Sequence, residues 1–218
     1  MKSKTNQNFI LTGLMFAVFA VFTLLVKFVD VQQIGPTGSS VGFASVNGAA
    51  FKLFGQNAVF DKISDLCLLA ALLSAVCFAA LGVLQLIKRK SFFKVDCDLY
   101  ALAGYYVLVA VFYLLFELIL VNQRPVLVDG VLEASYPSSH TLLVCSFMLA
   151  AIFQTEKRVK NKKLRTALIV AFVLLIVLTA VGRLLSGMHW LTDVLGGLVL
   201  GCALGMLYLS VARLLEKE

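Results

Sequence analysis

The feature that most constrains this chain is a set of six long apolar runs separated by shorter polar segments. A helix that crosses the hydrocarbon core of a bilayer needs about 20 predominantly apolar residues. The runs lack the two-residue alternation of a closed membrane barrel. We therefore expect an all-α, polytopic membrane protein, a single membrane-embedded domain over residues 1–218 built as a six-transmembrane-helix bundle. The expected spans are 9–28, 63–87, 99–121, 138–154, 166–184 and 190–212.

Composition supports a membrane protein. Of the 218 residues, 61% are hydrophobic and only 14% are charged, whereas a soluble domain carries about 25% charged residues. A soluble fold has no place to bury so much apolar surface, so a bilayer must solvate it. The first run is longer than the apolar region of a signal peptide, and we expect it to remain as an uncleaved span.

The net charge of +7 first suggests a nucleic-acid partner. The basic residues, however, gather in short segments that six crossings would place on one side of the membrane. The positive-inside rule makes that side cytoplasmic, so both termini are expected there and nucleic acid is rejected as a partner. These residues are Lys2, Lys4, Lys88, Arg89, Lys90, Lys94, Lys157, Arg158, Lys160, Lys162, Lys163, Arg165, Arg213 and Lys217.

The opposite, extracytoplasmic side receives the residues best suited to chemistry. The chain has two histidines, His140 and His189, and both fall at predicted helix starts on that side. Arg124, Arg183 and Asp193 fall there as well. A lone charge at a span end usually reaches for the headgroups or for water. Five such residues on one side of the membrane are too many to be five unrelated interfacial charges. Charged groups near a bilayer usually signal function or mutual pairing.

The residue types point to phosphate chemistry. Two arginines can hold a phosphate through forked hydrogen bonds, and two histidines can supply a nucleophile and a proton donor near neutral pH. Asp193 follows His189 by four residues, so a helix would place both on one face and the carboxylate could orient the imidazole. A metal site on His140, His189 and Asp193 is the alternative, but the two arginines would repel a divalent cation.

Three short motifs make the chain resemble the type 2 phosphatidic acid phosphatases, also called lipid phosphate phosphatases. That family carries a lysine, six residues and Arg-Pro; then Pro-Ser-Gly-His; then Ser-Arg, five residues, His, three residues and Asp. The first motif is matched at its end, and the second and third are matched with one change each. The matching residues are Arg124-Pro125, Pro137-Ser138-Ser139-His140, and Gly182-Arg183 with His189 and Asp193.

The resemblance implies roles for these residues. His189 would attack phosphorus and form a phosphohistidine, Asp193 would orient it, and His140 would protonate the leaving oxygen and then activate water. No metal or organic cofactor is implied. The substrate would be a lipid phosphate that enters from the bilayer, with undecaprenyl diphosphate favoured in a bacterial cell and phosphatidylglycerophosphate or phosphatidic acid next. The residues expected to hold the phosphate are Arg124, Arg183, Ser138 and Ser139.

Three positions depart from the family pattern. Ser139 replaces a glycine, Gly182 replaces a serine, and Glu117 stands where the lysine should be. A carboxylate there would repel phosphate, unless it pairs with an arginine, is protonated or contacts another part of the substrate. Glu117 therefore keeps a second hypothesis open, a non-catalytic protein that binds or moves a lipid phosphate. A small-solute transporter is disfavoured, because the spans show no inverted half-repeat.

Two further expectations concern the segments around this site. Residues 29–62 are either a connector with a short surface helix or, over residues 49–60, an interfacial element at a lipid entrance. Trp190 is interpreted as an interfacial anchor. Gly197, Gly201 and Gly205 are expected to let the last helix pack closely within the bundle.

Overall fold

The computed structural model describes residues 2–215 and confirms the all-α fold class. The helices are α1 (Lys2–Phe28), α2 (Ala44–Phe54), α3 (Ala58–Arg89), α4 (Cys97–Leu118), α5 (Ser139–Arg158), α6 (Lys162–Leu185) and α7 (Leu191–Leu215). Two short 3-10 turns, η1 (Pro36–Gly38) and η2 (Phe92–Lys94), lie in the connections. Each of the six predicted spans corresponds to one long helix, and α2 is an additional short helix.

Five of the long helices, α1, α3, α4, α6 and α7, are long and apolar enough to cross a membrane. The sixth, α5, has 20 residues. It corresponds to the expected span 138–154, which is the least apolar of the six runs. It packs against α3, α4, α6 and α7, and eleven of its residues are buried. Because protein rather than lipid surrounds it, α5 tolerates buried polar residues such as Ser146 and Gln154. The protein is therefore a multi-pass membrane protein.

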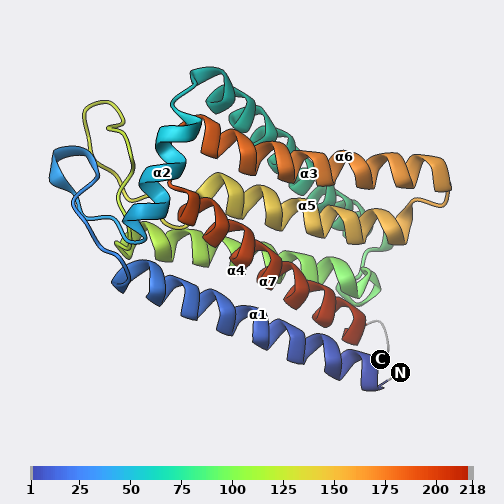
Figure 1. Cartoon of the computed structure of the whole chain (residues 1–218). Helices are drawn as coiled ribbons and strands as arrows, with labels where there is room; N and C mark the ends of the chain where they lie inside the picture. The colour runs from blue at the N-terminus through green and yellow to red at the C-terminus, as the bar shows by residue number, and fades with distance from the viewer. Residues whose placement is uncertain (1, 216–218) are drawn as a thin grey trace.

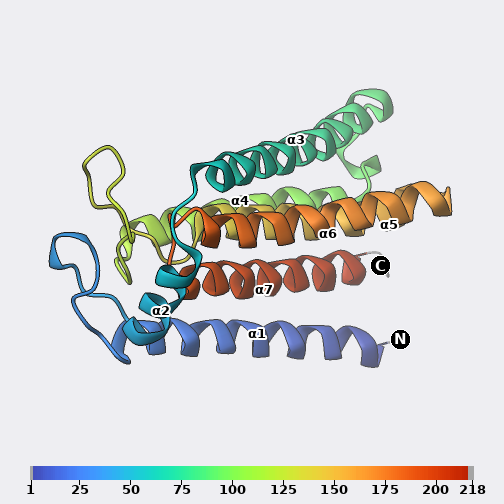
Figure 2. The ribbon, with the colours of Figure 1, turned by 45° about the horizontal axis from the view of Figure 1, so that its top comes forward.

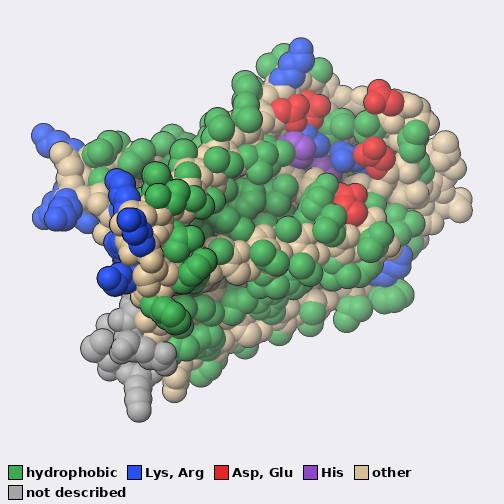
Figure 3. Space-filling model, turned by 180° about the vertical axis from the view of Figure 1, so that it is seen from behind, with side chains coloured by type: hydrophobic (Ala, Val, Ile, Leu, Met, Phe, Trp, Pro, Cys, Tyr) green, Lys and Arg blue, Asp and Glu red, His purple; other side chains and the backbone are tan. Residues whose placement is uncertain are grey.

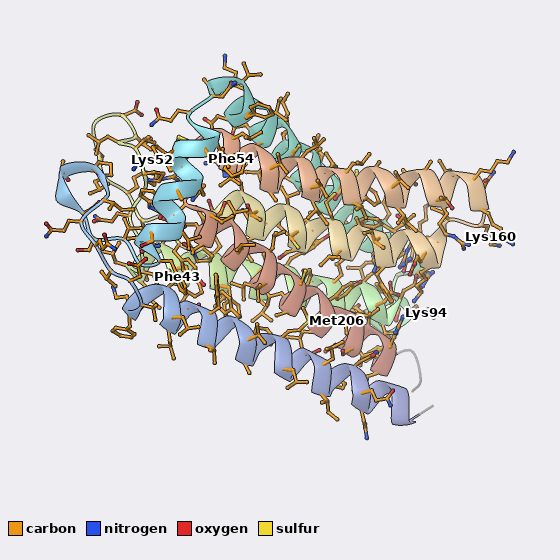
Figure 4. The ribbon with its side chains drawn as sticks, in the orientation of Figure 1. Phe43, Lys52, Phe54, Lys94, Lys160 and Met206 are labelled. Atoms are coloured by element: carbon orange, nitrogen blue, oxygen red, sulfur yellow. The ribbon has the colours of Figure 1, made fainter. Side chains whose placement is uncertain are left out.

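The long helices alternate in direction, so the described ends of the chain lie at the same end of the bundle (Figures 1 and 2). We call this the basic end, because it carries the α3–α4 and α5–α6 connections with residues such as Lys94 and Lys160 (Figure 4). Basic side chains gather there in the space-filling view (Figure 3). Lys217 and the side chains of Lys2 and Lys4 lie outside the described part.

The opposite end, which we call the site end, carries the α1–α3, α4–α5 and α6–α7 connections. It therefore receives His140, His189, Arg124, Arg183 and Asp193, as the even number of crossings between them predicts. Lys52 and Phe54 of α2 mark this end in Figure 4. Between the two ends, apolar side chains cover the outer surface (Figure 3), which suits contact with lipid tails.

Close packing of α7 against α5 fixes the centre of the bundle. A Cβ added to Gly197 would lie 2.8 Å from the Ser138 carbonyl oxygen, and one added to Gly201 would lie 2.8 Å from Cys145 Cβ. Any side chain at these positions would push the two helices apart. The small-residue ladder therefore has the predicted packing role, and it brings the first turns of α5 and α7 together.

At the basic end, a buried carboxylate ties α4 to α5. Asp98 is fully buried, and it accepts hydrogen bonds from Lys157 Nζ at 2.6 Å and Gln154 Nε2 at 2.9 Å. Arg158 Nη2 lies 2.8 Å from Oδ2, the oxygen that Gln154 also contacts. This pairing satisfies a charge that would otherwise be costly inside the bundle.

The segment over residues 29–62 is docked on the bundle through α2. Asn47, which is buried, donates to Thr192 Oγ1 at 2.9 Å and accepts from the Thr192 backbone N–H at 3.1 Å. Its amide also donates to the Gly42 carbonyl at 2.8 Å. The predicted short helix is thus present, and it is attached to the start of α7, where Asp193 lies.

The interpretation of Trp190 as an interfacial anchor is wrong. Its side chain is only 3% exposed, and its indole Nε1 donates to the Gln123 carbonyl at 2.7 Å. Phe51 of α2 packs against it with a ring-centroid distance of 5.5 Å. The sequence places Trp190 correctly at a span end, but α2 folds over that end and covers the indole.

Candidate active site

The structure brings the five predicted residues together from two connections, α4–α5 and α6–α7, and the helix ends that flank them. Arg124 lies in the α4–α5 connection, His140 in the first turn of α5, and Arg183 in the last turn of α6. His189 lies in the α6–α7 turn, and Asp193 lies in the first turn of α7. They are close enough that Arg183, Arg124 and His140 act electrostatically on His189.

His189 is 2% exposed, and its two ring nitrogens differ. Nδ1 lies 3.1 Å from the Ser135 carbonyl oxygen, which is hydrogen-bonding distance. Nε2 has no hydrogen-bond partner among the described residues. A carbonyl accepts but does not donate, so the ring carries its proton on Nδ1 and keeps a lone pair on Nε2.

The surroundings of His189 favour its neutral form. Burial lowers the pKa of His189 well below its ordinary value, and the charges of Arg183, Arg124 and His140 act in the same direction. The Ser135 carbonyl opposes them by accepting a hydrogen bond from Nδ1–H. At neutral pH the imidazole is therefore uncharged, and the lone pair on Nε2 is available.

Asp193 is fully buried beside His189, and neighbouring backbone N–H groups hold its carboxylate Oδ2 and its backbone carbonyl. Oδ2 accepts from the Trp190 N–H at 3.0 Å, and the Asp193 carbonyl accepts from the Ser138 N–H at 2.9 Å. The shortest separation of Oδ2 from His189 Nδ1 is 3.7 Å, which is too long for a hydrogen bond. The spacing of four residues thus brings the pair together, but the carbonyl of Ser135, which no motif singles out, accepts the hydrogen bond from Nδ1–H.

Both arginines have carboxylate partners. Arg183 is 2% exposed, and its Nη1 donates to Asp61 Oδ1 at 2.5 Å. Arg124 Nε lies 3.0 Å from Glu133 Oε2, and its Nη1 donates to the Met188 carbonyl at 3.4 Å. A guanidinium has five donors, so each arginine retains donors for an oxyanion.

The two serines of the second motif, Ser138 and Ser139, lie at different depths. Ser139 lines a small pocket together with Arg124 and His189. Ser138 lies beneath it, fully buried, where its hydroxyl accepts from Thr141 Oγ1 at 3.0 Å and its N–H donates to Asp193. Ser139 thus borders this pocket, whereas Ser138 joins the start of α5 to α7.

Gly187 shapes the turn that carries His189. Its φ is +69°, and an added Cβ would lie 2.9 Å from the Gly55 carbonyl oxygen and 2.7 Å from Gln56 Cγ. A side chain there would be strained in conformation and would collide with the α2–α3 link. No motif in the sequence points to this glycine, because its role depends on a long-range contact.

The departure at Gly182 has a packing explanation. A Cβ at this position would collide with Ser64 Oγ of α3 and lie 3.2 Å from the Phe60 carbonyl oxygen. Ser64 therefore fills, from α3, the space of the serine side chain that the family pattern places here. This close approach also brings Asp61, in the first turn of α3, onto Arg183.

Glu117 lines the same small pocket as Arg124 and His189 and lies exposed near the end of α4. The nearby arginine of the first motif, Arg124, forms its ion pair with Glu133 instead. The carboxylate at the family's lysine position thus borders the site directly. Among the described residues, no group of three or more His, Cys, Asp or Glu side chains is arranged to hold a metal ion.

Fold and site together define a multi-pass membrane protein that gathers two histidines, two arginines and a buried aspartate at one end of a helix bundle. The chain belongs to the PAP2 superfamily, whose family model matches residues 101–216. This confirms the resemblance seen in the three motifs, all of which lie in the matched range.

A solved structure has the same fold over nearly the whole chain. It is described as the first transmembrane PAP2 type phosphatidylglycerolphosphate phosphatase from Bacillus subtilis. The TM-score is 0.59 at 21% sequence identity, over 94% of this chain and 96% of that chain. At this identity the similarity establishes the shared fold. No curated protein sequence matches the chain significantly.

Proposed function

We propose that this protein is a phosphatase that hydrolyses a phosphate ester or diphosphate of a membrane lipid, with His189 as the nucleophile. The observation that carries the proposal is the state of the His189 ring. Its Nε2 is buried and unpartnered among the described residues, while its Nδ1 is held by Ser135. An oriented, neutral imidazole beside two arginines suits attack on phosphorus. Membership of the PAP2 superfamily supports the same reaction class.

The reaction would run in two steps. His189 Nε2 bonds to phosphorus as the bond to the leaving oxygen breaks, and His140 gives a proton to that oxygen. Water then attacks the phosphohistidine, His140 takes a proton from the water, and phosphate leaves. Asp193, 3.7 Å from the His189 ring, would stabilise the positive charge that the ring acquires during attack.

Arg124, Arg183 and Ser139 would hold the phosphoryl oxygens and neutralise the charge that develops on them. Ser138 would support them by fixing the start of α5 against Asp193. We propose that this charge stabilisation comes from the guanidinium groups and that no metal ion or organic cofactor is needed.

Access from the membrane fits a lipid substrate. On the face seen in Figure 3, the histidine side chains lie in a hollow bordered by basic, acidic and many apolar side chains, rather than at the tip of the bundle. A lipid could therefore present its phosphate while its tail stays in the bilayer. The basic end would be cytoplasmic by the positive-inside rule, which places both termini inside and the site outside the cytoplasm.

Undecaprenyl diphosphate is our first candidate substrate, followed by phosphatidylglycerophosphate and phosphatidic acid. Phosphatidylglycerophosphate gains support from the name of the Bacillus subtilis protein that shares the fold. Glu117 favours a second candidate function, a lipid-phosphate binder without catalysis, because its carboxylate borders the pocket where the family pattern has a lysine.

Phosphate release from purified protein separates the two functions. The protein in detergent would be given the three lipids, with and without a chelator, beside the His189→Ala variant. We expect release that survives chelation and disappears in the variant, together with a covalent phosphoprotein that is stable to base and labile to acid. Saturable lipid binding without release from any of the lipids would support the binder and overturn the phosphatase.

A further inference from the structure

The first turns of α3 present two carboxylates to the site. Asp61 and Asp65 are four residues apart, so they lie on one face of the helix. Asp61 Oδ1 lies 2.5 Å from Arg183 Nη1, and Asp65 Oδ1 lies 2.9 Å from His140 Nε2. This helix lies outside the range matched by the family model, residues 101–216. The two acids therefore come from a part of the chain that the three motifs do not describe.

The contact with Asp65 fixes the state of the His140 ring. A carboxylate accepts hydrogen bonds, so His140 Nε2 carries the proton in this contact. Its Nδ1 is buried and has no hydrogen-bond partner among the described residues. His140 thus has one ring nitrogen engaged and one available, as His189 does. Asp65 accepts a hydrogen bond from one ring nitrogen of His140, as the Ser135 carbonyl does from one ring nitrogen of His189.

Stability gives little reason for this pair. The side chain of Asp65 is 58% exposed and that of His140 is 21% exposed. Ion pairs with so much solvent contact contribute little to folding. The neighbouring acid, Asp61, is already occupied by Arg183, so the second carboxylate is left to orient the histidine.

We propose that Asp65 is a positioning residue that holds His140 with Nδ1 directed to the reaction. The proposal rests on the proposed function of His140 as acid and base. In the first step, the Nδ1–H of the imidazolium passes its proton to the leaving oxygen, which receives the electron pair of the breaking P–O bond. In the second step, Nδ1 takes a proton from water as the new O–P bond forms and the N–P bond to His189 breaks. Asp65 gains and loses no proton.

The test uses two substrates that differ in their need for an acid. An alkyl lipid phosphate has a poor leaving group, whereas an alkyl-substituted 4-nitrophenyl phosphate has a good one that departs without protonation. First-turnover rates would be measured for the full-length protein and for Asp65→Asn. Asp129→Asn, the same change at the exposed tip of the α4–α5 connection, is the matched control.

We expect Asp65→Asn to slow the first turnover of the lipid phosphate at least about tenfold and that of the aryl phosphate less than about threefold. The later turnovers of the aryl phosphate should slow as well, which leaves a burst of one nitrophenol per protein, because water attack still needs His140. Asp65→Glu, which keeps the carboxylate, should recover part of the lipid rate.

Equal losses on both substrates in the first turnover, or no loss on either, would overturn the role of Asp65. If Asp65→Asn fails to fold, Asp65→Glu carries the same comparison, and an unequal effect on the two substrates is again required. Inactivity of the unaltered protein on every phosphate would instead refute the proposed function, so the two failures are distinguishable.

Discussion

Gly182→Ser restores the residue of the family pattern, yet we expect it to damage this protein. The added Cβ would collide with Ser64 Oγ, and the Phe60 carbonyl oxygen lies 3.2 Å away on the other side. Both groups belong to α3, so relief requires α3 and α6 to separate. The ion pair between Asp61 and Arg183 joins the same two helices, and its 2.5 Å contact would lengthen.

The expected cost follows from the geometry. Overpacking of a close-packed site costs about 1–3 kcal/mol. We expect about 2 kcal/mol here, because one clashing atom is a hydroxyl that can rotate and the other is fixed backbone. For a chain of this length that corresponds to a fall of roughly 4–8 °C in the thermal midpoint. Activity should fall as well, since Arg183 would lose its held position.

A double-mutant cycle tests this reasoning. Ser64→Ala removes the clashing hydroxyl, and the hydroxyl introduced by Gly182→Ser could then donate to the Phe60 carbonyl in its place. The double variant should therefore recover about 1–2 kcal/mol relative to Gly182→Ser alone. Thermal unfolding in detergent and phosphate release would be measured for all four proteins. A Gly182→Ser variant as stable as the unaltered protein, or a cycle with no coupling, would show that α3 does not occupy this space.

Three further predictions concern other parts of the molecule. At pH 6 an ordinary histidine is about three-quarters protonated. Because the pKa of His189 is lowered, its ring ¹⁵N chemical shifts at pH 6 should remain those of a neutral imidazole. Imidazolium shifts at that pH would show that the ring is not held neutral. Asp98→Ala should lower stability by about 3 kcal/mol, measured by thermal unfolding, because Lys157 and Arg158 lose a buried partner. Glu117→Lys should raise kcat/KM for lipid phosphates by about tenfold, as a positive charge replaces a negative one beside the anion; a loss of activity would give Glu117 a role of its own.

The fold was predictable because membrane insertion leaves few alternatives. Each of the six apolar runs became a helix, since a bilayer allows no unpaired backbone. The weakest run, α5, was weak for a structural reason: neighbouring helices cover it, so its sequence did not need a lipid-facing composition. Helix α2 was harder to place, because its docking depends on the contact of Asn47 with Thr192, 145 residues away.

The site was predictable to the extent that it lies at helix ends. Counting crossings was enough to place His140, His189 and Asp193 at one end of the bundle. The partners of these residues were not predictable, because they depend on how side chains meet. Ser135 offers a backbone carbonyl, which no residue type reveals, and Asp65 lies about two turns into α3, a helix that none of the three motifs covers.

The carboxylates around the site also explain how its cations are tolerated without substrate. Arg183 is almost completely buried, and an unpaired charge there would cost several kcal/mol. Asp61 supplies the counter-charge, much as a phosphate oxygen would. In the proposed reaction, a dianionic headgroup entering the site would compete with Asp61 for the guanidinium, and Asp61, whose side chain is one-third exposed, would then be left to water. This competition would weaken substrate binding by the strength of the displaced pair and would favour release of the phosphate product. Acidic partners of the two arginines are therefore compatible with turnover, whereas Glu117 borders the pocket while Arg124 pairs with Glu133.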